Sequence, residues 1–307
     1  MAGPNSPKRA ANDLSLLLKA VLGEDRFPVD VEALALEVSK SQPDPITEIK
    51  RVEIPGFEGM LRAKRKSPGW QIICNAQERY PGRERFTLAH ELGHYQLHRR
   101  RLDENDYSGG RLPDGFDFEC LPLQSNVWRD VERDREEEAD TFASYLLMPI
   151  DDYREQVAGR KICKGLLKHI TNRYGVSLLA AVRKWIEFTE TRAAMIVARD
   201  GYALWGRASS AALASGIFVR SGMQIPDNAI ASIGPDALPV DQEKAVRVPA
   251  GVWRFSRGTE DATDLTIFSE RLGISVTVLQ FDGQGSGADY AEGETRDTYD
   301  QFVSNSR

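Results

Sequence analysis

Three of the chain's four histidines fall in one short segment, Phe86–His98. His90 and His94 are four positions apart, so on a helix their side chains share one face, with Cβ atoms roughly 5–6 Å apart. Two imidazoles at that spacing can bind one tetrahedral metal ion. Glu91 follows the first histidine and points beside the metal, where a carboxylate can take a proton from a water that the metal activates. The spacing therefore predicts an H-E-x-x-H zinc hydrolase motif.

A catalytic zinc needs a third protein ligand and keeps one position open. The candidates are three consecutive glutamates at the start of an apolar helical stripe (Ala139, Phe142, Ala143, Leu146 and Leu147). Glu137 points about 100° and Glu138 about 200° away from Glu136 around a helix. For any single one of them a solvated charge is the alternative, but Glu136 is the best candidate for a ligand.

Asp140 lies four positions after Glu136 and so shares its helix face. The pair resembles the E-x-x-x-D arrangement of the thermolysin-like zinc hydrolases. That resemblance implies that Glu136 binds the metal and that Asp140 orients a ligating histidine.

The two motifs together resemble the ImmA/IrrE family of metallo-endopeptidases. They read F-T-L-A-H-E-L-G-H-Y-Q-L-H at 86–98 and E-E-E-A-D-T-F-A-S-Y-L-L-M-P at 136–149. The resemblance implies a zinc peptidase that cleaves a helix-turn-helix repressor of the XRE type and so induces stress or mobile-element genes. Carried over residue by residue, the ligands would be His90, His94 and Glu136, and Glu91 would be the base. Mn²⁺ and Fe²⁺ remain alternatives to Zn²⁺.

One departure from the family pattern is the acidic stretch 102–126, which separates the two motifs. It is too long for a simple connector, so a lid, an exosite and an ordered spacer all stay open. The residue that stabilises the oxyanion is also left open among Tyr107, Tyr145 and His98.

The expected fold class is α+β. A thermolysin-like minimal zinc peptidase domain at 1–150 would carry a small antiparallel sheet from strands at 49–54, 57–63 and 70–74. A helical, helix-turn-helix-like module would follow at 151–192 and a mixed α/β sensor-like domain at 193–290, GAF-like by family analogy. Asp200-Gly201 is a strong hairpin signal in that last domain. Residues 291–307 form a Gly-rich, acidic tail that is expected to be disordered.

The segment Leu166–Trp185 resembles a helix-turn-helix, with Gly175 at the turn and Ser177 as a helix cap. Its second helix begins Leu178-Leu179-Ala180-Ala181, which offers few groups that could read bases. We therefore favour a module that supports the peptidase or docks a partner over one that binds DNA.

Composition narrows the remaining classes. The 307 residues carry 40 basic and 46 acidic side chains, a net charge of −6, which argues against broad coating of DNA. No apolar run is long enough for a membrane span, and the three scattered cysteines (Cys74, Cys120 and Cys163) read as reduced thiols of a cytoplasmic protein. The rival to an enzyme is a non-proteolytic metal-binding regulator or antitoxin-like partner-binding protein. Glu91 favours the enzyme, because a structural zinc needs no base.

Overall fold

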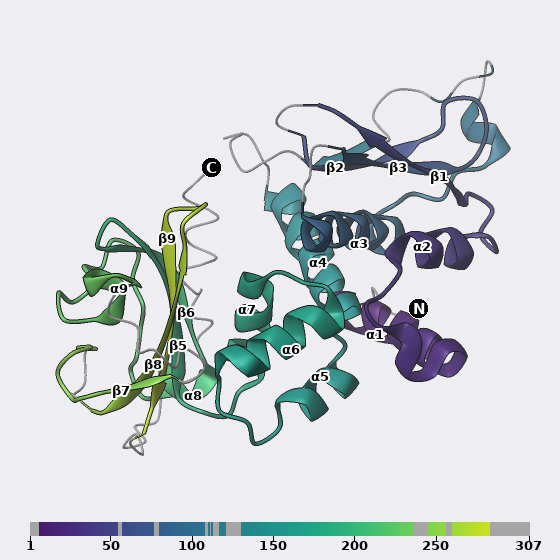
Figure 1. Cartoon of the computed structure of the whole chain (residues 1–307). Coiled ribbons are helices and arrows are strands. Elements are labelled where there is room, and N and C mark those ends of the chain that lie inside the picture. The colour runs from purple at the N-terminus through teal and green to yellow at the C-terminus, as the bar shows by residue number, and fades with distance from the viewer. Residues whose placement is uncertain are drawn as a thin grey trace. The chain divides into compact units, whose positions relative to one another are not determined.

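The structure is a computed structural model that describes residues 6–54, 57–76, 80–107, 110, 112, 117–120, 130–235, 245–255 and 260–282. It divides into two compact units. The first contains the chain up to Tyr153 together with Thr171–Ser177, and the second contains Arg154–Ile170 and the chain from Leu178 onward. The α+β class is confirmed (Figure 1). The expected disorder of 291–307 falls outside the described residues.

The sheet of the first unit has the strand order β1-β3-β2-β4, with β1 at Ile46–Val52, β2 at Gly59–Ala63, β3 at Trp70–Asn75 and β4 at Asp117–Cys120. β2 pairs antiparallel with β3, as expected, and also with β4, a strand that the sequence analysis did not predict, but β1 pairs parallel with β3. The expectation of a wholly antiparallel sheet was therefore wrong for β1. Turn signals indicate which strands follow each other along the chain, but they do not fix which strands pair, and β3 lies between β1 and β2 with Trp70, Ile72 and Cys74 buried.

Part of the acidic stretch 102–126 is built into this sheet. Glu104–Tyr107 forms a short 3₁₀ helix, η2, and β4 extends the sheet beyond β2 through backbone pairs such as Gly59 with Cys120. This part of the stretch is thus ordered structure. Most of its remaining residues, Asp114 among them, lie outside the described residues. A lid, an exosite and a spacer therefore stay open as predicted roles for the stretch.

Two helices cross beneath the sheet and carry the candidate site residues. α3 (Pro81–Leu97) starts with proline in its first turn and packs against β2 and β3, and α4 (Asp130–Leu147) packs against α3 (Figure 1). The predicted apolar stripe of α4 is buried, with Ala139, Phe142 and Ala143 fully covered. A Cβ atom at Gly93 would lie only 3.2 Å from Ala139 Cα, so glycine permits this close crossing.

The other helices of the first unit are α1 (Pro7–Leu22), the 3₁₀ turn η1 (Gly23–Arg26) and α2 (Val31–Ser39). Arg26 is buried and donates to Asp151 Oδ2 over 3.0 Å, which joins η1 to the start of α5 (Ile150–Val157). α6 (Lys164–Tyr174) ends at Gly175, whose φ of +61° is the left-handed conformation that stops a helix.

The second unit is built on a five-stranded antiparallel sheet of order β6-β5-β9-β8-β7. Its strands are β5 (Ala193–Arg199), β6 (Tyr202–Ala208), β7 (Val246–Val248), β8 (Ala262–Ser269) and β9 (Ile274–Phe281). The predicted hairpin is present, because Asp200 and Gly201 both have positive φ between β5 and β6. The helices are α7 (Leu178–Phe188), which packs on β5 and β6, and the short α8 (Ser210–Ala214) and α9 (Ile230–Ile233).

In the part of the chain that is described, no helix combines the length and apolarity needed to cross a membrane. Cys74 is buried and Cys163 half-buried, and both are free thiols, as the sequence predicts. Burial raises the pKa of the Cys74 thiol to about 12, which leaves it unreactive near neutral pH.

Candidate metal centre

Two imidazoles and one carboxylate meet where α3 crosses α4. The Nε2 atoms of His90 and His94 are 3.0 Å apart, and the two carboxylate oxygens of Glu136 each lie 3.2 Å from one of them. Ligands held about 2.0–2.1 Å from a tetrahedral zinc ion are themselves about 3.3 Å apart. The nitrogen and oxygen donors of His90, His94 and Glu136 therefore fit one such cation in both type and spacing. Among the described residues these three form the sole cluster of this kind.

The Glu136–Asp140 pair engages His90 from two sides. Asp140 Oδ1 lies 2.9 Å from His90 Nδ1, while Glu136 faces the opposite ring nitrogen, Nε2. Because the two acidic residues are one helical turn apart on α4, both contacts follow from a single helix face. Asp140 thus has the place that a residue orienting His90 requires.

Glu91 is fully buried, one position after His90, and does not belong to the three-residue cluster. The start of β2 lies directly over its carboxylate. A Cβ atom at Gly59 would come within 2.6 Å of Glu91 Oε1 and 2.5 Å of Thr87 Cγ2. Glycine at position 59 consequently leaves the space that the Glu91 carboxylate occupies beside the cluster.

The charge states at the cluster suit a cation. Burial lowers the pKa of His94 to about 4, while a hydrogen bond that the Glu136 carboxylate accepts from the ring works in the opposite direction. Burial also acts to raise the pKa of Glu136, but hydrogen bonds with His90 and His94 outweigh it and hold that pKa below its ordinary value. At neutral pH the site therefore presents a neutral His94 imidazole and an ionised carboxylate, the forms that bind metals.

The sequence analysis did not predict the contacts that His98 and Glu138 make. His98 Nδ1 lies 2.9 Å from His94 Nδ1, and His98 Nε2 lies 2.9 Å from Glu138 Oε2. The signal was present, because His98 continues the four-residue spacing of His90 and His94. His98 is therefore a poor candidate for the residue that stabilises the oxyanion, because both of its ring nitrogens face these partners.

The other two oxyanion candidates have partners of their own. Tyr107 donates to the carbonyl of Lys64 over 2.8 Å, and the ammonium of Lys8 lies over the ring of Tyr145. Neither contact places the phenol at the cluster, so the oxyanion group is still unassigned.

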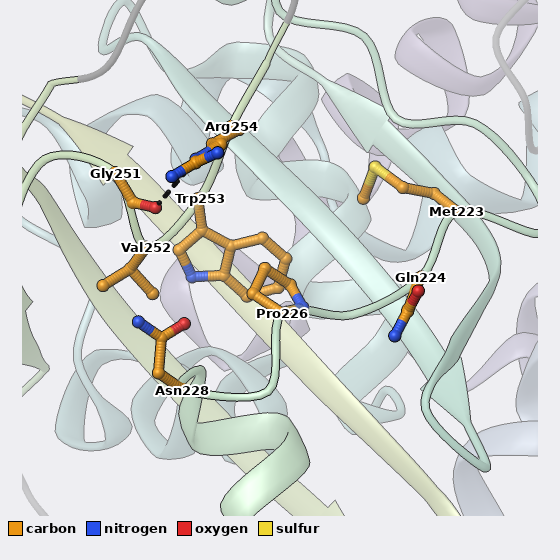
Figure 2. A pocket seen from close by; sticks show the side chains of 8 residues that line it. All are labelled: Met223, Gln224, Pro226, Asn228, Gly251, Val252, Trp253 and Arg254. Atoms are coloured by element: carbon orange, nitrogen blue, oxygen red, sulfur yellow. Dashed lines mark hydrogen bonds between the residues drawn. The ribbon is translucent and has the colours of Figure 1, made fainter.

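A different kind of hollow opens on the second unit, with a volume of about 310 Å³ (Figure 2). Trp253, Val252, Pro226 and Met223 give it apolar walls, and polar groups come from Gln224, Asn228, Gly251 and Arg254. None of these eight residues is a histidine, a cysteine or a carboxylate, so the hollow offers no metal site of the kind found at the α3–α4 crossing. The sensor-like role of this unit stays a prediction.

A helix with two histidines and a glutamate in H-E-x-x-H spacing, crossed by a helix whose glutamate faces both histidines, is an arrangement typical of metallopeptidase domains. Residues 49–185 match the sequence model of the Peptidase_M78 family, described as the IrrE N-terminal-like domain. The match includes α3, α4 and the helices up to α7. The family is one of zinc metallopeptidases, so the family and the cluster agree.

No curated protein matches the chain. Solved structures do match, among them one described as a Mycobacterium tuberculosis transcriptional regulator. It is 13% identical, with 90% of this chain and 82% of that chain covered and a TM-score of 0.47.

Proposed function

We propose that this protein is a zinc-dependent endopeptidase that cleaves a helix-turn-helix repressor in the cytoplasm. The observation that carries the proposal is the convergence of His90, His94 and Glu136 on one point, with Glu91 buried beside them. A purely structural zinc site would close with a fourth protein ligand. Within the described residues the cluster ends at three, which favours a catalytic site.

The residues divide the work of peptide hydrolysis between them. His90, His94 and Glu136 would hold the ion, and Zn²⁺ held there would supply a Lewis acid that polarises the scissile carbonyl and acidifies water towards a pKa of about 7. The Glu91 carboxylate accepts the proton of the attacking water and then delivers it to the leaving amine nitrogen. Asp140 accepts from His90 Nδ1–H and so fixes the ring with Nε2 towards the ion.

The choice of substrate follows the family resemblance, with one supporting observation from the second unit. Val182, Trp185 and Ile186 of α7 are buried, and α7 packs on the sheet of its own unit. A helix covered in this way has little surface left for reading bases. A repressor protein is therefore the proposed partner, in place of DNA.

One experiment separates metal binding from catalysis. The chain is purified with zinc and incubated with a helix-turn-helix repressor of the XRE type, chosen from the neighbouring genes if one is encoded there. Glu91→Gln should retain about one zinc per chain and lose roughly 10²- to 10⁴-fold in cleavage rate, because the amide cannot accept the proton. Glu136→Ala should lose both the zinc and the cleavage.

Glu137→Gln is the matched control, because Glu137 is the exposed neighbour of Glu136 and pairs with Arg133 on α4. It should behave as the unmodified chain does. Full cleavage by Glu91→Gln, or retained zinc in Glu136→Ala, would contradict the assigned roles. Zinc binding without cleavage of any repressor would favour the non-proteolytic regulator.

A further inference from the structure

A chain of hydrogen-bonding groups runs away from the metal centre behind His94. His94 Nδ1 lies 2.9 Å from His98 Nδ1, and His98 Nε2 lies 2.9 Å from Glu138 Oε2. The His98 side chain is only 5% exposed, whereas that of Glu138 is 51% exposed. This series of hydrogen bonds therefore starts at the buried His94 and ends at the Glu138 carboxylate, which is exposed to solvent.

Only one placement of protons satisfies these contacts when His94 binds a metal through Nε2. The Nδ1 atom of His94 then carries the proton and donates it to His98 Nδ1, which must be an acceptor. His98 is neutral with its own proton on Nε2, and that proton is donated to the Glu138 carboxylate. With the protons placed in this way, each hydrogen bond between His94, His98 and Glu138 joins one donor to one acceptor.

The two ligand histidines are thus held in related ways by one helix. His90 Nδ1 meets the carboxylate of Asp140 directly, while His94 Nδ1 reaches the carboxylate of Glu138 through the imidazole of His98. Both carboxylates belong to α4, two positions apart. A carboxylate behind a ligating histidine fixes its tautomer and ring orientation and raises its basicity.

We propose that His98 and Glu138 are positioning residues for the metal and act in series on His94. This proposal rests on the metal site proposed above and adds a specific relay to it. Its chemical content is that the carboxylate of Glu138 selects the Nε2–H form of His98, and that this form holds His94 ready to bind through Nε2.

The test is the zinc affinity of the full-length chain, measured by competition with a chromophoric chelator. His98→Phe keeps a ring but removes the acceptor, and Glu138→Gln removes the charge at the end of the relay. Each should weaken zinc binding by about 10- to 100-fold. His98→Asn places an amide oxygen near the position of Nδ1, so it should bind zinc more tightly than His98→Phe. Glu137→Gln again serves as the matched control and should bind as the unmodified chain does.

The double variant His98→Phe/Glu138→Gln shows whether the two residues act in series. A relay predicts that Glu138→Gln adds nothing once His98 is gone, whereas a carboxylate acting through space would add its full effect. Additive losses, or unchanged affinity in Glu138→Gln, would overturn the relay. If His98→Phe does not fold, the zinc affinities of Glu138→Gln, at a half-exposed position, and of His98→Asn still test whether the relay supports zinc binding. An unmodified chain that binds no zinc would instead remove the proposed metal site together with the relay.

Discussion

At the scale of single residues, the protonation of His94 links the site to the stability of the protein. Burial holds its pKa at about 4 in the folded chain, against about 6.5 in an unfolded one. As the pH falls below 6.5, the unfolded state takes up a proton that the folded state refuses, so the free energy of unfolding falls. The loss should be complete near pH 4 and amount to about 3 kcal/mol.

Urea titrations of EDTA-treated protein between pH 7 and pH 4.5 measure this dependence. Protonation of Glu136 also lowers the free energy of unfolding, but only at lower pH, because its pKa too is held below its ordinary value in the folded state. The variant His94→Gln should show a shallower decline across this range than the unmodified chain. An equally steep decline in that variant would show that other groups bind the protons.

At the scale of elements, the close crossing of α3 and α4 decides whether Glu136 reaches the two histidines. A Cβ atom at Gly93 would lie 3.1 Å from Phe142 Cδ1 and 3.2 Å from Ala139 Cα. We expect Gly93→Val to cost about 1–3 kcal/mol in stability through overpacking. It should also weaken zinc binding, because α4 must move away from α3.

Gln96→Val introduces the same β-branched side chain at a half-exposed position of α3 and is the control for helix propensity. Thermal unfolding and chelator competition on both variants supply the measurements. If Gly93→Val bound zinc as tightly as Gln96→Val, the helix crossing would not be what aligns Glu136.

At the scale of the whole molecule, the metal should stabilise the two units unequally. All three proposed ligands belong to the first unit, whereas the sheet of β5 to β9 has its own core around Ile196, Leu279 and Trp253. A ligand that binds only the native site stabilises it by about 4 kcal/mol at a thousand times its dissociation constant. Removal of zinc with EDTA should therefore speed amide hydrogen exchange in α3 and α4 and leave β5 to β9 unchanged.

Exchange measured by mass spectrometry with and without zinc reads both units in one sample. Glu136→Ala is the control, since its exchange should not respond to zinc at all. Equal changes in both units would mean that they open together as one cooperative body.

Local geometry alone determined much of this protein from its sequence. A spacing of four places His90 and His94 on one helix face, and Asp200-Gly201 permits the positive φ angles of a tight hairpin, wherever the rest of the chain lies. The same spacing favoured Glu136 over its neighbours and placed Asp140 beside it. These inferences hold because each depends on residues within one or two turns of backbone.

Only the tertiary structure decided what lies across from these residues. The parallel pairing of β1 with β3 and the addition of β4 to the sheet depend on contacts between segments far apart in the chain. Helix geometry predicts that Glu138 points away from Glu136. It could not predict that His98 contacts Glu138, because that contact joins two different helices. Such contacts are set by packing, as at Gly93 and Ala139, and packing is a property of the assembled core.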